Sequence, residues 1–291
     1  MTDTLSPNVD IKSGAYNKYI SSPVNKTDKI EYELFKIFED EINSNNSILL
    51  GYRPQAVKKM AKFIAGDIKR SASIGIAGET ASGKSTITFD IINTIQLFSD
   101  RFNIGKVITR VNTDDYYYDR SEQVKKAGGM AEFAKTYDFD IPEALELDLM
   151  YKHILQLLSG KSVMLPKYDM SGTTIRIDDC IPAEPSKIII SEGLFTLTDK
   201  IKDAFDFKIY VDINSAIQKK RFFIRANERR LGKSAGKIYR NASDKAEIYI
   251  RPCKKQADIV LSGEAQRSGY KMFVNKILSI AQQVYFSYQD F

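Results

Sequence analysis

Hydrophobic positions recur at two different periods along this chain, and the change between them predicts its elements. Residues 29–46 carry apolar side chains four apart, which predicts a helix with one apolar stripe that the Asn-Ser-Asn-Asn cluster at 43–46 ends. The stripe consists of Ile30, Leu34, Phe38 and Ile42. Residues 53–70 predict a second amphipathic helix, with a proline near its start. The segment 1–28 is polar and rich in Ser, Asn, Lys and Asp, so it predicts a flexible tail.

From residue 73 onward, short apolar runs alternate with helical periodicity. The runs predicted as strands are 73–77, 106–111, 187–190, 207–211 and 258–261. Helices are predicted at 86–98, at 143–158, at 215–230 and in a closing segment that carries Phe273, Ile277, Ile280 and Val284. This alternation predicts an α/β fold with a parallel sheet covered by helices on both faces. Ligands of such folds bind at the carboxyl ends of the strands. Residues 163–186 break the alternation and predict a small hairpin flap.

Composition narrows the class of protein without naming an activity. The 291 residues are 43% hydrophobic and 27% charged, which is ordinary for a globular protein. No run approaches the apolar length of a membrane span, and we expect a cytoplasmic protein. Cys180 and Cys253 are too few and too far apart for a metal pattern. The net charge of +6 is spread along the chain among 37 acidic residues, which favours a solvated basic surface over a nucleic-acid site.

The single histidine, His153, lies within an amphipathic helical run. We therefore expect it to be a surface or packing residue. Histidine-based acid–base or metal chemistry is accordingly not expected.

Residues 78–85 read GETASGKS and match the G-x-x-x-x-G-K-[ST] pattern of a phosphate-binding loop. A predicted strand precedes the loop and a predicted helix follows it, as this motif requires. The glycines let backbone N–H groups converge on phosphate oxygens, and the helix directs its positive end at the same anion. Lys84 adds a mobile charge, and the Ser85 hydroxyl can ligate Mg²⁺. The predicted phosphate-binding residues are Gly78, Glu79, Thr80, Ala81, Ser82, Gly83, Lys84, Ser85 and Thr86.

Carboxylates follow two of the predicted strands. Asp114 comes after the strand at 106–111, where it can hold Mg²⁺ or accept a proton from an attacking hydroxyl. Glu192 comes after the strand at 187–190, at the position that holds the water shell of Mg²⁺ in phosphate-loop enzymes. Three consecutive tyrosines at 116–118 suit a wall for a planar or sugar-like ligand. The alternative for Asp114 is an Asp-rich turn.

The predicted helix at 215–230 is strongly basic. Arg221 and Arg225 are four apart and share a helical face, and Arg229 and Arg230 end the helix. Guanidinium groups on a lid that closes over a triphosphate would neutralise charge on the transferred phosphoryl group. The alternative is a basic helix face in solvent.

These blocks, taken in order, resemble the uridine kinase group of phosphate-loop kinases, which includes phosphoribulokinase and, further off, bacterial pantothenate kinase. They are GETASGKST, TDDYYYD, YDFDIPEALELDL with PKYDMSG, IIISEGLFTL and FKIYVDINSAIQKKRFFIRANERR, and RPCKKQADIVL resembles the adenine-contacting segment. The resemblance implies a phosphate-loop NTPase fold with a hairpin flap and a lid, ATP and Mg²⁺ as cofactors, and a kinase domain at 72–291. That leaves a flexible tail at 1–28 and a helical appendage at 29–71.

The resemblance also implies roles for particular residues. The implied catalytic residues are Asp114, as general base for a 5′-hydroxyl, with Lys84 and Arg221. Arg225 and Arg229 would join the loop on the ATP phosphates. The implied acceptor residues are Tyr117 and Phe139 beside the sugar, Asp140 on the ribose hydroxyls, Tyr168 against the base, and Arg221. The implied Mg²⁺ residues are Ser85, Glu192 and Asp114.

One stretch departs from the group's pattern. Uridine-cytidine kinases place a histidine a few residues after the tyrosine that corresponds to Tyr168, and this chain has Ser-Gly-Thr-Thr at 171–174. We predict a kinase acting on the 5′-hydroxyl of a uridine- or cytidine-like nucleoside. A phosphoribulokinase-like or pantothenate-kinase-like enzyme for another small alcohol stays open, as does GTP as donor. A nucleotide-dependent NTPase that binds nucleic acid through the basic segments 53–70 and 215–230 is the alternative of another class. We expect a homo-oligomer with a small-molecule substrate, and neither nucleic acid nor membrane as partner.

Overall fold

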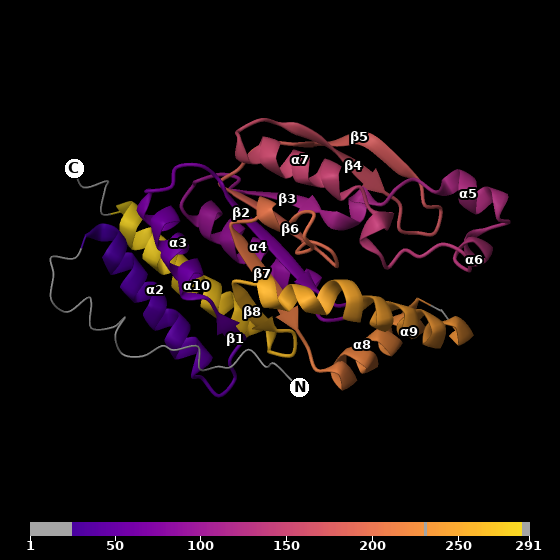
Figure 1. Ribbon diagram of the computed structural model, residues 1–291. Coiled ribbons are helices and arrows are strands. Elements are labelled where there is room, and N and C mark those ends of the chain that lie inside the picture. The colour runs from indigo at the N-terminus through magenta and orange to yellow at the C-terminus, as the bar shows by residue number, and fades with distance from the viewer. Residues whose placement is uncertain (1–24, 230–231, 287–291) are drawn as a thin grey trace.

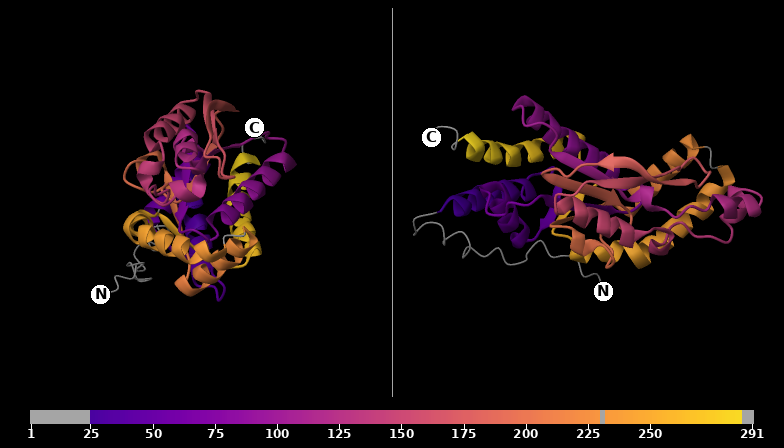
Figure 2. Two further views of the ribbon diagram at one scale, coloured as in Figure 1. Left: turned by 90° about the vertical axis from the view of Figure 1, so that its right-hand side faces the viewer. Right: turned by 90° about the horizontal axis from the view of Figure 1, so that it is seen from above.

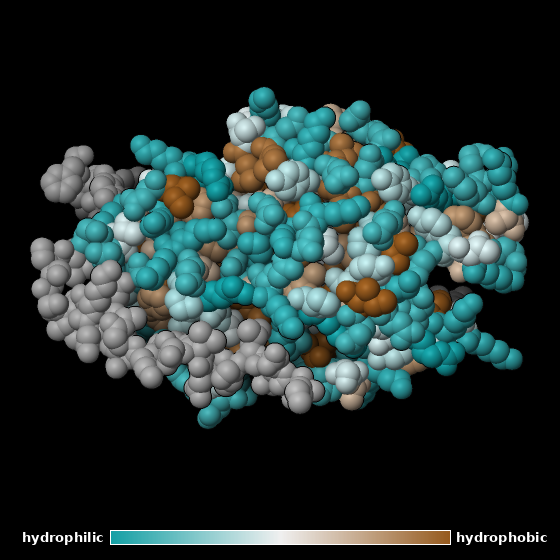
Figure 3. Space-filling view, viewed as in Figure 1, coloured by the Kyte–Doolittle hydropathy of each residue, from teal (hydrophilic) through white to brown (hydrophobic). Residues whose placement is uncertain are grey.

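A computed structural model describes residues 25–229 and 232–286. The tail predicted at 1–28 therefore lies almost entirely outside the described residues, as does Arg230 at the end of the predicted basic helix. In Figure 1 the described chain forms one central sheet with helices on both sides and a smaller hairpin above it. The face seen in Figure 3 is mainly hydrophilic with isolated apolar residues.

The central sheet has six strands in the order β1-β8-β7-β2-β6-β3. The strands are β1 (Leu49–Tyr52), β2 (Ala72–Gly78), β3 (Ile108–Asn112), β6 (Ile188–Gly193), β7 (Phe207–Asp212) and β8 (Ile259–Ser262). All neighbouring pairs are parallel except β1 with β8. The predicted α/β class with a mainly parallel sheet is confirmed. Because the parallel strands share a direction, their carboxyl ends meet along one edge. The phosphate loop and Asp114 follow β2 and β3 there, and Glu192 lies near the end of β6.

Helices cover both faces of this sheet (Figures 1 and 2). The first face packs against α2 (Lys26–Ile42), α3 (Pro54–Ala65), α4 (Lys84–Arg101) and α10 (Arg267–Phe286). The opposite face packs against α7 (Leu147–Leu158) and a π-helical turn at Ala246–Ile250. Within the described part of the chain, no helix is both long enough and apolar enough to cross a lipid bilayer.

Two smaller units stand over the carboxyl edge of the sheet. The predicted flap is confirmed as an antiparallel hairpin of β4 (Val163–Tyr168) and β5 (Arg176–Ala183). The predicted basic helix is α8 (Ser215–Glu228), which Asn214 caps and which α9 (Ala235–Lys245) follows. We call α8 and α9 together the lid. Two short helices, α5 (Ser121–Lys126) and α6 (Met130–Phe133), extend the same end of the molecule (Figure 1).

The first helix ends at Ile42, and Asn43 returns its side-chain amide to the carbonyl of Glu39. The predicted end at the Asn-Ser-Asn-Asn cluster is therefore confirmed, whereas two other predicted boundaries were wrong. The second helix ends at Ala65, where Gly66 adopts φ +83°. The helix predicted from residue 143 begins at Leu147, because Pro142 starts a separate 3₁₀ turn.

Strand β1 was not predicted at all. Its four residues include a glycine and lie between two helices, so no periodicity marks them. They become a strand because β8, far along the chain, offers an antiparallel partner. The segment predicted as a helical appendage, 29–71, thus also adds a strand to the sheet and apolar side chains to the core of the first face.

Candidate active site

The phosphate loop lies between β2 and α4 and depends on unusual backbone geometry. Ala81 and Gly83 both adopt positive φ, at +65° and +98°, and Gly83 is the residue before the first turn of α4. At Gly78 a side chain would meet Ser82 Oγ and the Val211 carbonyl, each at 2.8 Å. The loop can therefore curl only because small residues occupy these places.

Lys84 follows this loop and lies close enough to Glu192 to feel its charge. Burial lowers the pKa of Lys84, while the carboxylates of Glu192 and Asp114 act in the opposite direction. Ser85 Oγ donates to Glu192 Oε2 at 3.1 Å, and Arg110 Nη2 pairs with Glu192 Oε1 at 2.9 Å. The register explains this arrangement, since Glu192 of β6 lies between Ile76 of β2 and Asn112 of β3.

The hydroxyl of Ser85 and the carboxylates of Glu192 and Asp114 are hard oxygen donors, which suit Mg²⁺ rather than a softer metal. Magnesium is usually held by one or two carboxylates and a hydroxyl, with substrate phosphates and water completing the shell. Two buried side-chain polar atoms here, Ser82 Oγ and Arg110 Nε, have no hydrogen-bond partner among the described residues. Residues 25–229 and 232–286 together contain no cluster of three or more His, Cys, Asp or Glu that could hold a metal ion. Ser85, Glu192 and Asp114 fit a metal that arrives with a phosphate ligand.

The two neighbouring aspartates after β3 have different surroundings. Burial raises the pKa of Asp114, Lys84 opposes that rise, and Glu192 and Asp115 add to it. Asp115 is instead held in place, because it accepts from Asn112 Nδ2 at 3.0 Å and from the Tyr168 backbone N–H at 3.2 Å. Lys167 Nζ also lies 3.2 Å from Asp115 Oδ1. Asp115 therefore ties the flap to the sheet, and Asp114 is left facing Lys84 and Glu192.

The three tyrosines do not form one wall, so that prediction was wrong for two of them. Tyr116 is fully buried and shares a hydrogen bond of 2.9 Å with His153 Nδ1. Tyr118 is exposed beside the Arg120 guanidinium. Only Tyr117 faces the site, since the short 3₁₀ turn at Thr113–Tyr116 points successive side chains in different directions. The packing role expected for His153 is confirmed.

Tyr117 belongs to an aromatic group on the flap side of the site. Its ring lies 5.3 Å from that of Tyr168 and 6.1 Å from that of Phe139, and Tyr137 packs edge-on against Phe139 at 4.8 Å. Burial, with smaller effects from charged neighbours, raises the pKa of Tyr168 to about 12. These rings can surround a flat or sugar-like molecule while remaining neutral near pH 7.

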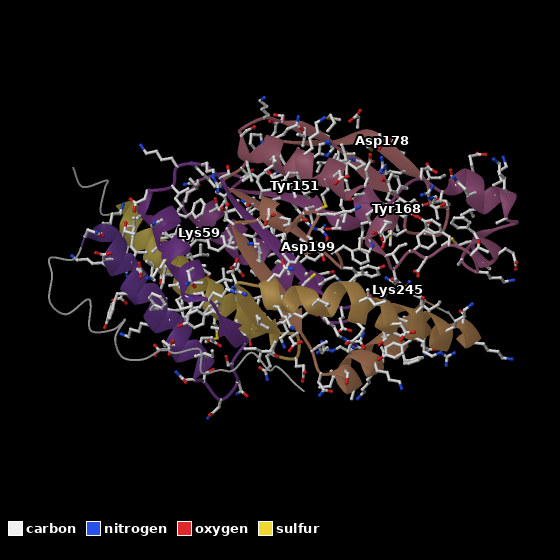
Figure 4. All side chains as sticks on the ribbon, in the orientation of Figure 1. Lys59, Tyr151, Tyr168, Asp178, Asp199 and Lys245 are labelled. Carbon is white, nitrogen blue, oxygen red and sulfur yellow. The ribbon has the colours of Figure 1, made fainter. Side chains whose placement is uncertain are left out.

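Asp140 lies beside this aromatic group and is reached by the lid. Burial and then Asp138 raise the pKa of Asp140. Asn241 Nδ2 of α9 donates to Asp140 Oδ2 at 3.3 Å and to Asp138 Oδ1 at 3.1 Å. Lys245 Nζ lies 3.1 Å from Asp138 Oδ2, so the end of α9 is joined to the aspartates. In Figure 4, Tyr168 projects from the flap and Lys245 from the end of α9. Asn241 and Lys245 were not predicted from the sequence, because nothing before folding relates α9 to residue 140.

The stretch that lacks the expected histidine forms a tight turn. Asp169 accepts hydrogen bonds from the Ser171 backbone N–H at 2.8 Å and from its hydroxyl at 2.7 Å. The Thr173 hydroxyl donates to the same carboxylate at 2.5 Å. The polar side chains at 171 and 173 therefore form hydrogen bonds within the turn itself. Arg120, whose Nε donates to Tyr137 Oη at 3.3 Å, is the cation nearest to the aromatic group from the α5 side.

The lid also contacts the phosphate loop. Gln218 of α8 is buried, donates to the Thr80 carbonyl at 2.8 Å and accepts from Tyr239 Oη of α9 at 3.1 Å. Arg221 Nη1 donates to the Gly263 carbonyl at 2.7 Å, beside Gly83. Arg225 is exposed but acts on the pKa of Lys84, and Arg229 lies exposed at the end of α8. Gln218 was missed in the sequence because an uncharged residue among lysines and arginines carries no motif.

Glu79 of the phosphate loop is held from the segment that resembles an adenine contact. Arg251 reaches it with two bonds, Nε to Oε1 at 2.9 Å and Nη2 to Oε2 at 3.1 Å. Such a two-point contact fixes the angle between the two groups as well as their distance. The loop is therefore supported from the lid through Thr80 and from residue 251 through Glu79.

Known proteins resemble this chain over most of its length. Residues 73–267 match the family described as phosphoribulokinase / uridine kinase. A uridine kinase of Clostridium perfringens is 34% identical over 218 residues, which cover 73% of this chain and 98% of the relative. A uridine kinase of Staphylococcus aureus is 30% identical over 222 residues, covering 74% of this chain and 100% of the relative.

Among solved structures, phosphoribulokinase from Rhodobacter spheroides is similar in fold. It superposes with a TM-score of 0.50 at 15% identity, covering 67% of this chain and 70% of that protein. At that identity the likeness concerns the fold alone. Residues before 73 lie outside the family match, and they contribute α2, β1 and α3.

Proposed function

Because the chain belongs to the phosphoribulokinase / uridine kinase family, it is a small-molecule phosphotransferase with an alcohol acceptor, and we propose that the acceptor is the 5′-hydroxyl of a nucleoside. Membership of the family implies ATP as the donor. We propose Mg²⁺ as the accompanying metal, held by Ser85, Glu192 and Asp114 together with the phosphates.

One observation carries the proposal. Asp114, whose carboxylate interacts with Lys84, precedes Tyr117 by three residues, and Tyr117 packs against Tyr168 and Phe139 next to Asp140. Burial raises the pKa of Tyr117, and the charges of Asp114 and Asp140 add to this rise, so both carboxylates lie near that side chain. A sugar between them would present a primary hydroxyl to Asp114 and its secondary hydroxyls to Asp140.

Each group then has a defined task in the reaction. The loop amides and Lys84 hold the phosphates, and Asp114 accepts the proton of the attacking hydroxyl. Arg221 and Arg225 add positive charge as negative charge develops on the transferred group, with Arg229 at the edge of the lid. Mg²⁺, when bound, neutralises phosphate charge and orients the oxygens for in-line transfer. The two substrates can bind next to each other, because the donor and acceptor residues lie at the carboxyl ends of the adjacent strands β2, β6 and β3.

The acceptor pocket favours a nucleoside over a smaller alcohol. Tyr117, Phe139 and Tyr168 supply an aromatic surface that ribulose 5-phosphate or pantothenate has no flat ring to fill. With Ser171 and Thr173 bonded to Asp169, base discrimination falls to other polar groups beside the aromatic group, such as Tyr137 and Arg120. We propose a pyrimidine nucleoside with weaker base selection than a histidine would give.

The test is ADP release measured with ATP and a panel of acceptors. Uridine, cytidine, adenosine, guanosine, pantothenate and ribulose 5-phosphate are supplied one at a time, with Mg²⁺ and then with excess chelator. We expect uridine or cytidine to stimulate ADP release above the ATP-only rate, and the chelator to abolish the stimulation. Stimulation by pantothenate or ribulose 5-phosphate alone would refute the nucleoside assignment while leaving the family intact.

The remaining predictions are properties of the protein outside the site. The homo-oligomeric state and the cytoplasmic location stay predictions. The alternative of a nucleic-acid-binding NTPase is disfavoured by family membership.

A further inference from the structure

A large apolar cavity lies at the opposite end of the sheet from the phosphate loop. Its volume is about 760 Å³, and it opens between α3, α4, α10 and the first residues of the parallel strands. Ile188, Phe207 and Ile259 are each the first residue of their strand, whereas the phosphate loop follows the last residue of β2. In Figure 1 this end carries α2, α3 and the end of α10, and the lid is at the other end. The cavity is therefore separate from the proposed active site.

The lining of this cavity is almost entirely hydrocarbon. Phe63 of α3, Ile74 of β2 and Ile277 of α10 face it from three sides. Ile74 lies in a central strand yet remains only partly buried, as does Ile188. Protein interiors ordinarily leave few voids larger than a water molecule, so an apolar cavity of this size has room for an apolar guest. Its volume falls in the range of ligand-binding pockets, which is about 300–1,000 Å³.

Cations occupy the opening of the cavity. Lys69, Arg70 and Lys187 are lining residues with exposed side chains. Arg70 already pairs with Asp206, with Nη1 to Oδ2 at 2.7 Å and Nη2 to Oδ1 at 2.6 Å. Lys69 and Lys187 make no ion pair with any carboxylate in residues 25–229 or 232–286. Two ammonium groups at the opening of an apolar cavity select a guest with a long apolar body and one anionic end.

We propose that this cavity binds a long-chain carboxylate, a fatty acid anion, with its hydrocarbon chain between α3, α10 and the sheet and its carboxylate between Lys69 and Lys187. Burial of each methylene group contributes about 0.8 kcal/mol, so a long chain supplies the affinity and the two lysines supply the orientation. The site is independent of the kinase reaction, whose residues follow the other ends of the same strands. Nothing in the proposed transfer chemistry requires it.

The test is binding of palmitate to the full chain, measured by calorimetry below the concentration at which palmitate aggregates. Hexadecyltrimethylammonium and hexadecanol serve as probes of the same length with the opposite charge and with no charge. We expect saturable palmitate binding that is at least about tenfold tighter than that of either probe, a difference worth roughly 1.4 kcal/mol. Equal affinity for palmitate and hexadecanol, or no saturable binding of palmitate, would overturn the proposal.

Variants locate the site. The double substitution Lys69→Glu with Lys187→Glu should weaken palmitate at least about tenfold and leave hexadecyltrimethylammonium unweakened. The matched control is Lys62→Glu with Lys161→Glu, which reverses two exposed lysines outside the lining. Val274→Trp, which partly fills the cavity, should weaken binding of all three probes. Unchanged ADP release by each variant shows that it is folded, and palmitate binding that neither the charge reversal nor the filling weakens would refute the site.

A photoreactive palmitate maps its binding site on the protein directly. Cross-links are expected on peptides of α3 and α10. Cross-links confined to other surfaces would contradict the proposal. Occupation of the cavity by residues 1–24 of the same chain would also contradict the proposal. A photoreactive amino acid at position 277 would reveal that occupation by cross-linking to those residues.

Discussion

The side chain of Gln218 in lid helix α8 donates to the backbone carbonyl of Thr80 in the phosphate loop at 2.8 Å. The same amide accepts from Tyr239 Oη of α9 at 3.1 Å, so one residue joins both lid helices to the loop. Because Gln218 is buried, its replacement leaves polar groups without partners.

We expect Gln218→Ala to lower kcat/KM for ATP by about tenfold or more, from a loss of roughly 1–3 kcal/mol. The reason is that an unpaired Thr80 carbonyl allows the loop to leave the phosphate-binding geometry. Steady-state ADP release at varied ATP measures it. Lys220→Ala, an exposed change two residues away, is the control and should match the wild type. Equal kinetics for the two variants would show that the contact is incidental.

Asp114→Asn should reduce transfer by about 10²–10⁴-fold, the usual contribution of a general base, while ATP still binds. Single-turnover transfer and equilibrium ATP binding separate the two effects. Asp115→Asn is the informative comparison, because Asp115 holds Lys167 and the Tyr168 backbone. It should raise KM for the acceptor through the flap. A larger loss of transfer in Asp115→Asn than in Asp114→Asn would reverse the assignment of roles.

The pH dependence of transfer follows from the same carboxylate. Burial raises the pKa of Asp114, against the opposing effect of Lys84. A base must be deprotonated to act, so activity should fall as pH drops through this raised pKa, above the ordinary Asp value of about 3.9. The measurement is kcat/KM for the acceptor against pH, with the folded fraction followed by circular dichroism. An acid limb at or below the ordinary value would contradict the assignment.

Asn241→Leu should raise KM for the acceptor about tenfold and leave KM for ATP nearly unchanged. The substitution removes the amide that donates to both Asp140 and Asp138, which leaves a partly buried carboxylate less well supported. Acceptor and ATP titrations on the same preparation measure the two constants. Arg240→Ala, on the exposed face of α9, is the control. A rise in KM for ATP instead would mean that α9 acts on the loop and not on the acceptor.

Stability should depend on pH through Asp206. Burial alone would raise the pKa of Asp206, but Arg70 and Ser73 outweigh it and the pKa is lowered. A lowered folded-state pKa stabilises the fold at pH above the unfolded value, about 3.9, and this stabilisation is lost as pH falls through the folded pKa. Arg70→Met should therefore lower the free energy of unfolding at pH 6 and lose that effect in acid. Urea unfolding at several pH values tests it, and a difference that does not change with pH would exclude this ion pair as the cause.

Local patterns were enough to predict the parts of this protein that a short segment encodes. The loop at 78–85 depends on consecutive residues, and the strands after it are continuous apolar runs, so both were predictable. Glu192 and Asp114 were predictable as strand-end carboxylates because a parallel sheet brings such ends together. Strand β1 was not, since its partner β8 lies about two hundred residues away, and neither was the different direction of each tyrosine at 116–118.

Sequence by itself determined the family, the α/β fold class and the place of the phosphate-loop motif, because motif spacing and period are local properties of the chain. Only the tertiary structure decided which groups meet across elements. It brought Gln218 to Thr80, Asn241 to Asp140 and Arg251 to Glu79, and it left a cavity under the opposite ends of the strands. The physical reason is that hydrogen bonds and voids depend on distances between segments, which no local periodicity specifies.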